Sequence, residues 1–119
     1  MKALIGIKEE RLNRLRKNNL HTLEIITPDN VATSEELENG ELVFITSEGK
    51  NDLTVESSGV IGEIKTKDVF RQKVNTLYDE VETLTVRLQV EHMDEGRVKN
   101  VLIKDLGVEV EIEKNLFVG

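Results

Sequence analysis

Positive charge is concentrated near the start of this sequence. Five basic residues fall between positions 8 and 17: Lys8, Arg11, Arg14, Arg16 and Lys17. Guanidinium groups bind phosphate through paired hydrogen bonds, so Arg11, Arg14 and Arg16 form a candidate surface for a second anionic ligand or an acidic partner. The alternative is a solvated helix face whose cations pair with Glu9 and Glu10.

A second group of chemically useful residues lies farther along the chain. Asp94, Arg97 and Asn100 have the types that recognise a ribose-phosphate group, because a carboxylate accepts hydrogen bonds from ribose hydroxyls. Phe70 is able to stack on a base, as aromatic side chains do at nucleotide sites. The alternatives are an exposed hairpin tip for Arg97 and core packing for Phe70.

The residue types needed for catalysis are sparse. The chain has two histidines, His21 and His92, no cysteine, and no serine in a G-x-S-x-G turn. His92 and Asp94 give two metal ligands without a third. The segment 59–62 lacks the Lys-Ser/Thr of a phosphate-binding loop, so its glycines predict a turn or a β-bulge. We therefore expect a protein that is not an enzyme and that carries neither metal nor cofactor.

Composition bounds the class of protein. The 119 residues are 38% apolar, 33% charged and only 3% aromatic, which favours one domain over 1–119 with a thin aliphatic core. Small cores of this kind often gain stability by oligomerisation. The net charge of -7 argues against non-specific binding to nucleic acid or to anionic membranes. No apolar run has the length of a membrane span or a signal peptide, so we expect a cytoplasmic protein.

The hydrophobic pattern predicts a sheet-rich chain with two helices. Strands are expected at 3–7, 20–27, 41–46, 53–55, 60–64, 83–91, 97–104 and 108–113. A basic helix is expected at 8–18, and a capping box at 33–36 predicts a short helical turn. Met93 to Gly96 is expected to turn the chain between two strands of a hairpin.

The second helix is predicted over 66–81. Its apolar residues fall at i, i+4, i+7, i+8 and i+11, which places them in one stripe: Phe70, Val74, Leu77, Tyr78 and Val81. The fold class is therefore α+β. It should consist of a small antiparallel sheet, an N-terminal basic helix and one longer amphipathic helix, assembled as a symmetric homo-oligomer.

Three segments resemble a known family. The start 2–12, the stretch from Asp68 to Val81 and the ending 105–110 look like the corresponding parts of the Thoeris anti-defence sponge proteins, a group of small phage proteins. That resemblance implies sequestration, without turnover, of cyclic ADP-ribose signals made by TIR-domain enzymes. It also implies an α+β homo-oligomer, a dimer or a hexamer, with ligand pockets between protomers. Some similar proteins also hold cyclic oligonucleotides at separate sites.

The resemblance also implies site residues. An aromatic ring and an arginine that sandwich adenine would correspond to Phe70 and Arg97, with Arg71 beside the ring. Asp94 or Glu95, and Asn100, would serve the ribose and phosphate region.

Other functions remain open at this point. The first is an acidic protein-interaction inhibitor, which would show a continuous acidic face. The second is a virion assembly component, which would form rings or filaments. An enzyme would convert a cyclic nucleotide into a linear product.

Overall fold

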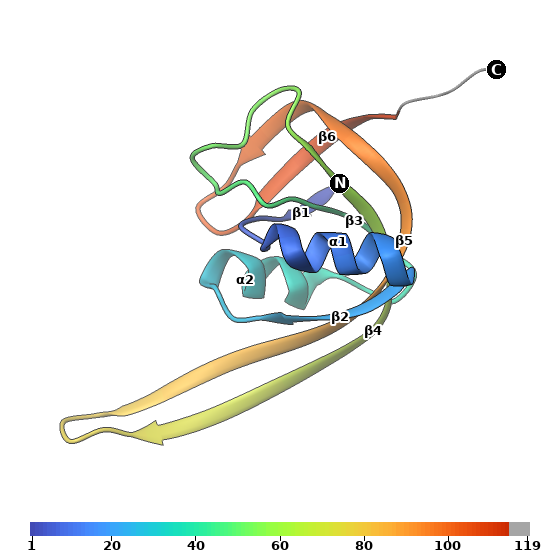
Figure 1. Ribbon diagram of the computed structural model, residues 1–119. Coiled ribbons are helices and arrows are strands. Elements are labelled where there is room, and N and C mark those ends of the chain that lie inside the picture. The colour runs from blue at the N-terminus through green and yellow to red at the C-terminus, as the bar shows by residue number, and fades with distance from the viewer. Residues whose placement is uncertain (115–119) are drawn as a thin grey trace.

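The computed structural model describes residues 1–114 of the chain. Six strands and two helices form an α+β fold in which both helices precede β3 (Figure 1). In chain order the elements are β1 (Lys2–Leu4), α1 (Glu9–Asn18), β2 (Leu20–Ile25), α2 (Pro28–Glu36), β3 (Leu42–Ile45), β4 (Ser58–Asn75), β5 (Glu80–Ile103) and β6 (Val108–Lys114).

The six strands form one mixed sheet that curls back on itself. The strand order is β2-β5-β4-β3-β1-β6, and β6 pairs in addition with β5. The strands β5, β4, β3, β1 and β6 therefore make a closed ring, and β2 lies outside it on the first half of β5. Because β1 runs parallel to β3, the predicted purely antiparallel sheet is wrong at this one pair.

Two hydrophobic clusters lie on opposite sides of the curled sheet. The first lies inside the ring around Phe44, Ile61 and Val98, all nearly inaccessible to solvent. The second lies between the outer side of the ring and the two helices, where Leu12 and Leu15 of α1 pack with Leu23, Val86 and Leu88. This division explains why both Val60 and Ile61, on opposite faces of β4, are buried.

The glycines of 59–62 allow strands to approach closely at the bend of β4. A Cβ atom on Gly59 would lie 2.4 Å from the carbonyl oxygen of Ile45 and 2.6 Å from the ring of Phe44. The pairing register shifts between Ile61 and Gly62, which agrees with the predicted bulge.

Beyond the body of the protein, β4 and β5 continue as a two-stranded hairpin. We call this hairpin, residues 70–85, the arm. Its ladder runs from Phe70–Thr85 outward to Asn75–Glu80, and the turn is closed by a bond from the Thr76 amide to the Asp79 carbonyl at 2.8 Å. The arm projects far from the helices (Figure 1) and gives the molecule extents of 61 × 28 × 24 Å.

The arm replaces the helix predicted over 66–81, and that prediction was wrong. A spacing of four residues is even, so Phe70 and Val74 share a face on a strand as well as on a helix. Val81 then pairs with Val74 across the ladder. The β-branched residues of the segment favour a strand. Helical spacing within one segment gives no information about the strand with which that segment pairs.

The expected hairpin turn at Met93 to Gly96 was also wrong. Strand β5 runs through it without a break, and the register moves from Ile61–Asp94 to Gly62–His92. Met93 is therefore the extra residue of a bulge, which uses the same polar and glycine-containing sequence that a turn would use.

Smaller predictions had mixed outcomes. The strands predicted at 3–7, 20–27, 41–46 and 108–113 and the helix at 8–18 are confirmed within a few residues. The prediction of a strand at 53–55 was wrong, because these residues lie in the loop between β3 and β4. Helix α2 begins at Pro28, before the predicted capping box at 33–36, because proline is favoured at the first helical position.

Candidate ligand-binding groove

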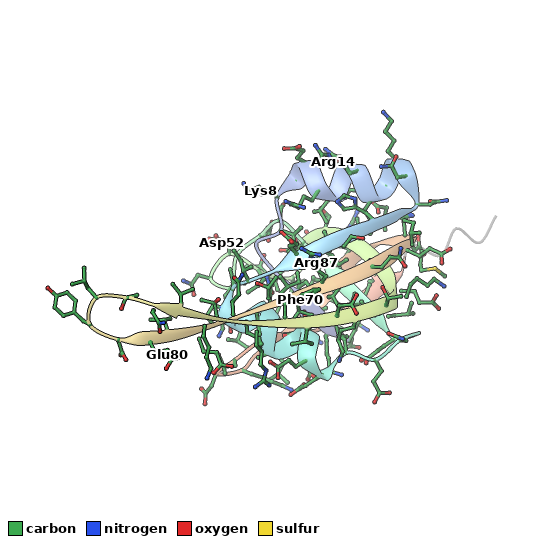
Figure 2. All side chains as sticks on the ribbon, turned by 90° about the horizontal axis from the view of Figure 1, so that it is seen from below. Lys8, Arg14, Asp52, Phe70, Glu80 and Arg87 are labelled. Carbon is green, nitrogen blue, oxygen red and sulfur yellow. The ribbon has the colours of Figure 1, made fainter. Side chains whose placement is uncertain are left out.

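An aromatic ring and a guanidinium group lie together where the arm leaves the body. The Arg87 guanidinium carbon is 4.8 Å from the centre of the Phe70 ring, within the range of a cation–π contact. Arg87 also donates a hydrogen bond from Nε to Glu24 at 3.0 Å. Figure 2 shows Phe70 and Arg87 on neighbouring strands at this place, with Lys8 at the start of α1.

Strand pairing explains why these side chains meet. Glu24 of β2 is paired with Arg87 of β5, and Arg87 is in turn paired with Asp68 of β4. Directly opposed residues point to the same face of a sheet, and Phe70 is two positions farther along that face. The face turns away from the hydrophobic clusters, so Phe70 keeps 46% of its surface exposed.

Two hollows meet at this place. The first, the arm groove, has a volume of about 500 Å³ and is lined by Phe70, Gln72, Thr85 and Arg87 among others. The second, the α1–β2 cleft, has a volume of about 320 Å³ and is lined by Lys8, Arg11 and Thr27 among others. Glu24 and Ile26 line both, so the two hollows adjoin at β2, and each has the size that small ligands occupy. We call the two hollows together the depression.

Two cations border the α1–β2 cleft. Lys8 immediately precedes α1 and is exposed, and Arg11 is half-buried in the first turn of that helix. Neither makes an ion pair within residues 1–114. The amino end of a helix also carries partial positive charge, so this end of the depression suits an anion.

The other two candidate arginines of α1 are already engaged. Arg14 donates to Glu10 at 2.6 Å, and Arg16 donates to Glu9 at 3.1 Å and to Glu95 at 2.6 Å. Hydrogen bonds from Ser47 and then Arg16 lower the pKa of Glu9. Arg14 and Arg16 therefore form ion pairs with carboxylates, as the alternative interpretation of a solvated helix face expects. Of the three arginines, only Arg11 lines the cleft.

His21 lies beneath the same helix. Its Nε2 atom is buried without a hydrogen-bond partner in the part of the chain that the structure describes. Burial lowers the pKa of His21, and the positive charges of Arg11 and Arg14 lower it further. A neutral imidazole is therefore favoured at this position.

Arg71 also lines the arm groove, and its Nη1 lies 3.7 Å from Glu82. Asp94 and Asn100 lie elsewhere. Asp94 accepts a hydrogen bond from the Glu95 amide at 2.8 Å, and Asn100 donates to Glu111 at 3.0 Å. The latter bond lowers the pKa of Glu111.

The structure does not bring Phe70 and Arg97 together within one chain. Arg97 is paired with Ser58 at the far end of β4, whereas Phe70 is paired with Thr85 on the arm. The two positions are twelve residues apart along β4, roughly 40 Å at the rise of a strand. The arginine on the ring of Phe70 is Arg87 instead.

Sequence reasoning missed Arg87 and Glu24. Both sit on the polar side of alternating segments, a position that predicts exposure and nothing more. Reading 66–91 as a hairpin around the sequence Asn75 to Asp79 would have placed Arg87 beside Phe70. The position of Glu24 beside Arg87 depends on the pairing of β2 with β5, which no local sequence pattern predicts.

Two features are absent from residues 1–114. Within that range no helix is both long and apolar enough to cross a membrane. The same residues contain no group of three or more His, Cys, Asp or Glu side chains placed to hold a metal ion.

Comparison with known proteins gives two matches. The chain is 33% identical over 108 residues to the uncharacterized protein MJ0105 of Methanocaldococcus jannaschii, an alignment that covers 91% of this chain and 69% of that protein. Residues 1–112 match the family described as "Protein of unknown function (DUF473)". The chain therefore belongs to the DUF473 family.

Proposed function

We propose that this protein acts in the cytoplasm and binds a nucleotide without chemical turnover, in the depression formed by the arm groove and the α1–β2 cleft. The observation that carries the proposal is the stacked pair of Phe70 and Arg87, which offers a flat surface for a base. Both aromatic rings and guanidinium planes stack on bases. Lys8 and Arg11, at the other end of the depression, are available for phosphate.

The chemistry of the lining supports binding rather than turnover. Among the described residues that line the two hollows there is no histidine, cysteine or serine. The carboxylate present in both, Glu24, is engaged with Arg87. The described lining therefore offers no histidine as a base for its two threonines, Thr27 and Thr85, and no cysteine or serine nucleophile.

The ligands implied by the resemblance, cyclic ADP-ribose isomers and cyclic oligonucleotides, belong to this chemical class. Capture of such a ligand as a defence signal rests on the resemblance alone. The groove supports only the narrower part of the proposal, which is an adenine-type base near Phe70 and anionic groups toward Lys8 and Arg11.

The first experiment is ligand capture and release. Purified protein is incubated with cyclic ADP-ribose isomers, cyclic dinucleotides or linear ADP-ribose, freed of unbound ligand, heat-denatured and analysed by mass-resolved chromatography. Recovery of the intact ligand supports binding without turnover. A linear product from a cyclic ligand would make the protein an enzyme, and recovery of nothing from folded protein would refute nucleotide binding.

Matched variants locate the site. Arg87→Ala and Phe70→Ala should each weaken the binding of the captured ligand by about tenfold or more in calorimetry, because each removes half of the stacking surface. Arg97→Ala is the control, since it removes the same charge far from the groove. Equal losses in Arg87→Ala and Arg97→Ala would show a general effect of net charge and would contradict this placement.

A further inference from the structure

The arm has one charged face and one uncharged face. Strand pairing places Phe70 opposite Thr85, Gln72 opposite Thr83 and Val74 opposite Val81. Together these six side chains form what we call the uncharged face. The other face carries two weak ion pairs, Arg71–Glu82 at 3.7 Å and Lys73–Glu80 at 3.9 Å.

Nothing in the described chain covers the uncharged face. Phe70, Val74 and Val81 are 44–46% exposed, and Leu77 and Tyr78 at the turn are 93% and 96% exposed. A two-stranded hairpin is only marginally stable in water by itself. An antiparallel sheet with one apolar and one polar face normally packs the apolar face against something.

We propose that the uncharged face is a homodimer interface. Two copies pack their arms antiparallel, uncharged face on uncharged face, about a twofold axis that lies in the interface and passes between the Val74–Val81 pairs of the two copies. The occupant of the face is thus a second copy of this chain. This arrangement is isologous, so it closes at two copies.

The spacing along the arm fits this axis. The turn at Leu77 and Tyr78 lies about three and a half residues beyond Val74, and Phe70 lies four residues before it, so both are roughly 12 Å away. The turn of each copy would therefore reach Phe70 of the other. The six uncharged side chains and the two turn residues would bury on the order of 1,000 Å² in total, which is the lower end for a stable interface.

The charged side chains of the arm remain in solvent in this arrangement. Arg71, Lys73, Glu80 and Glu82 lie on the opposite face of the arm, where they form the two weak ion pairs. Packing of the uncharged faces therefore buries no charged side chain of the two paired strands, and it avoids the cost of burying an unpaired charge.

The dimer stands independently of any ligand. A consequence that does rest on the proposed function is that Tyr78 of the second copy would lie over the arm groove. A bound base would then have Phe70 and Arg87 on one side and this tyrosine on the other.

Single-cysteine variants test the interface, because the chain has no native cysteine. Val74→Cys would place two thiols across the axis, and Lys73→Cys would place them on the outward faces. Facing sheets lie about 10 Å apart, so a short bis-maleimide spans the gap. We expect the cross-linker to form covalent dimer at least about tenfold faster with Val74→Cys than with Lys73→Cys. Equal rates for the two variants would overturn the proposed face.

Sedimentation of the native chain without nucleotide supplies the second readout. We expect a species of twice 13.5 kDa at concentrations of about 100 μM, with Val81→Lys raising the dimer dissociation constant by about tenfold or more. Circular dichroism shows whether Val81→Lys remains folded. A native chain that stays monomeric at this concentration overturns the proposal, even if nucleotide binding succeeds.

Discussion

At the scale of single residues, the side chain of Asn30 makes the hydrogen bonds to the Ile5 backbone that a neighbouring strand would otherwise make. Its side chain accepts a hydrogen bond from the Ile5 amide at 2.9 Å and donates one to the Ile5 carbonyl at 2.7 Å. Asn30 is only 4% exposed, so no solvent replaces these bonds. It therefore fixes the path of the chain from β1 toward α1 and shapes the adjoining cleft.

Removing this side chain should be costly. Asn30→Ala leaves a buried amide and a buried carbonyl without partners, so we expect the free energy of unfolding to fall by about 2–4 kcal/mol. Urea denaturation measures the loss. Asn100→Ala is the control, because that exposed side chain bonds only Glu111, and we expect a change within about 0.5 kcal/mol. Similar losses in the two variants would contradict this account.

His21 should give the protein a pH-dependent stability. Burial and then Arg11 and Arg14 hold the pKa of His21 below its ordinary 6.5 in the folded state. The unfolded chain then binds the proton more readily, so this contribution to stability is lost as pH falls from 6.5 to the folded pKa.

The measurement is urea denaturation at a series of pH values from about 7.5 to about 5. His21→Gln removes the titrating group, so its stability should vary less over this interval than that of the native chain. Carboxylates titrate mostly below this interval in both proteins. Parallel curves for the two proteins would show that the imidazole does not control this loss.

At the scale of elements, the arm is separate from the two hydrophobic clusters. Neither cluster contains a residue from 65–85. Replacing residues 70–85 with an Asn-Gly turn should therefore leave the free energy of unfolding of the body within about 1 kcal/mol of the native value. Urea denaturation of the shortened monomer checks this, and a loss of several kcal/mol would show that the arm supports the body.

The same elements show how far the sequence predicts the fold. Alternation gave the correct strands where one face is buried, as at Val86, Leu88 and Val90. It failed on the arm, because Phe70 and Val74 at a spacing of four satisfy both a helix and a strand. The failure at Met93 arose because bulges and turns use the same residue types.

The candidate site was predictable only in part. Phe70 and Arg11 were identified from residue type and do line the two hollows. The pairing of β4 with β5 places Arg87 in the site, and the pairing of β2 with β5 places Glu24 there. The first register follows from the hairpin around Asn75 to Asp79, whereas the second is set by the whole fold and leaves no mark on either segment alone.

At the scale of the whole molecule, ring closure joins the two ends of the described chain. Ala3 of β1 pairs with Val108 of β6, and the amino group of Met1 donates to the Val110 carbonyl at 2.9 Å. The inner cluster is complete only when β6 has joined the ring, because Val108 and Val110 belong to it.

This closure has a consequence for the order of folding. Contacts between partners more than a hundred residues apart require a large loss of chain entropy before they stabilise anything, so they form late. During synthesis, β1 can pair with β3, but its other edge stays unpaired until the segment 108–114 has left the ribosome. The nascent chain therefore exposes a strand edge until that segment emerges, and protection of that edge, rather than the final stability, would govern the yield of native protein.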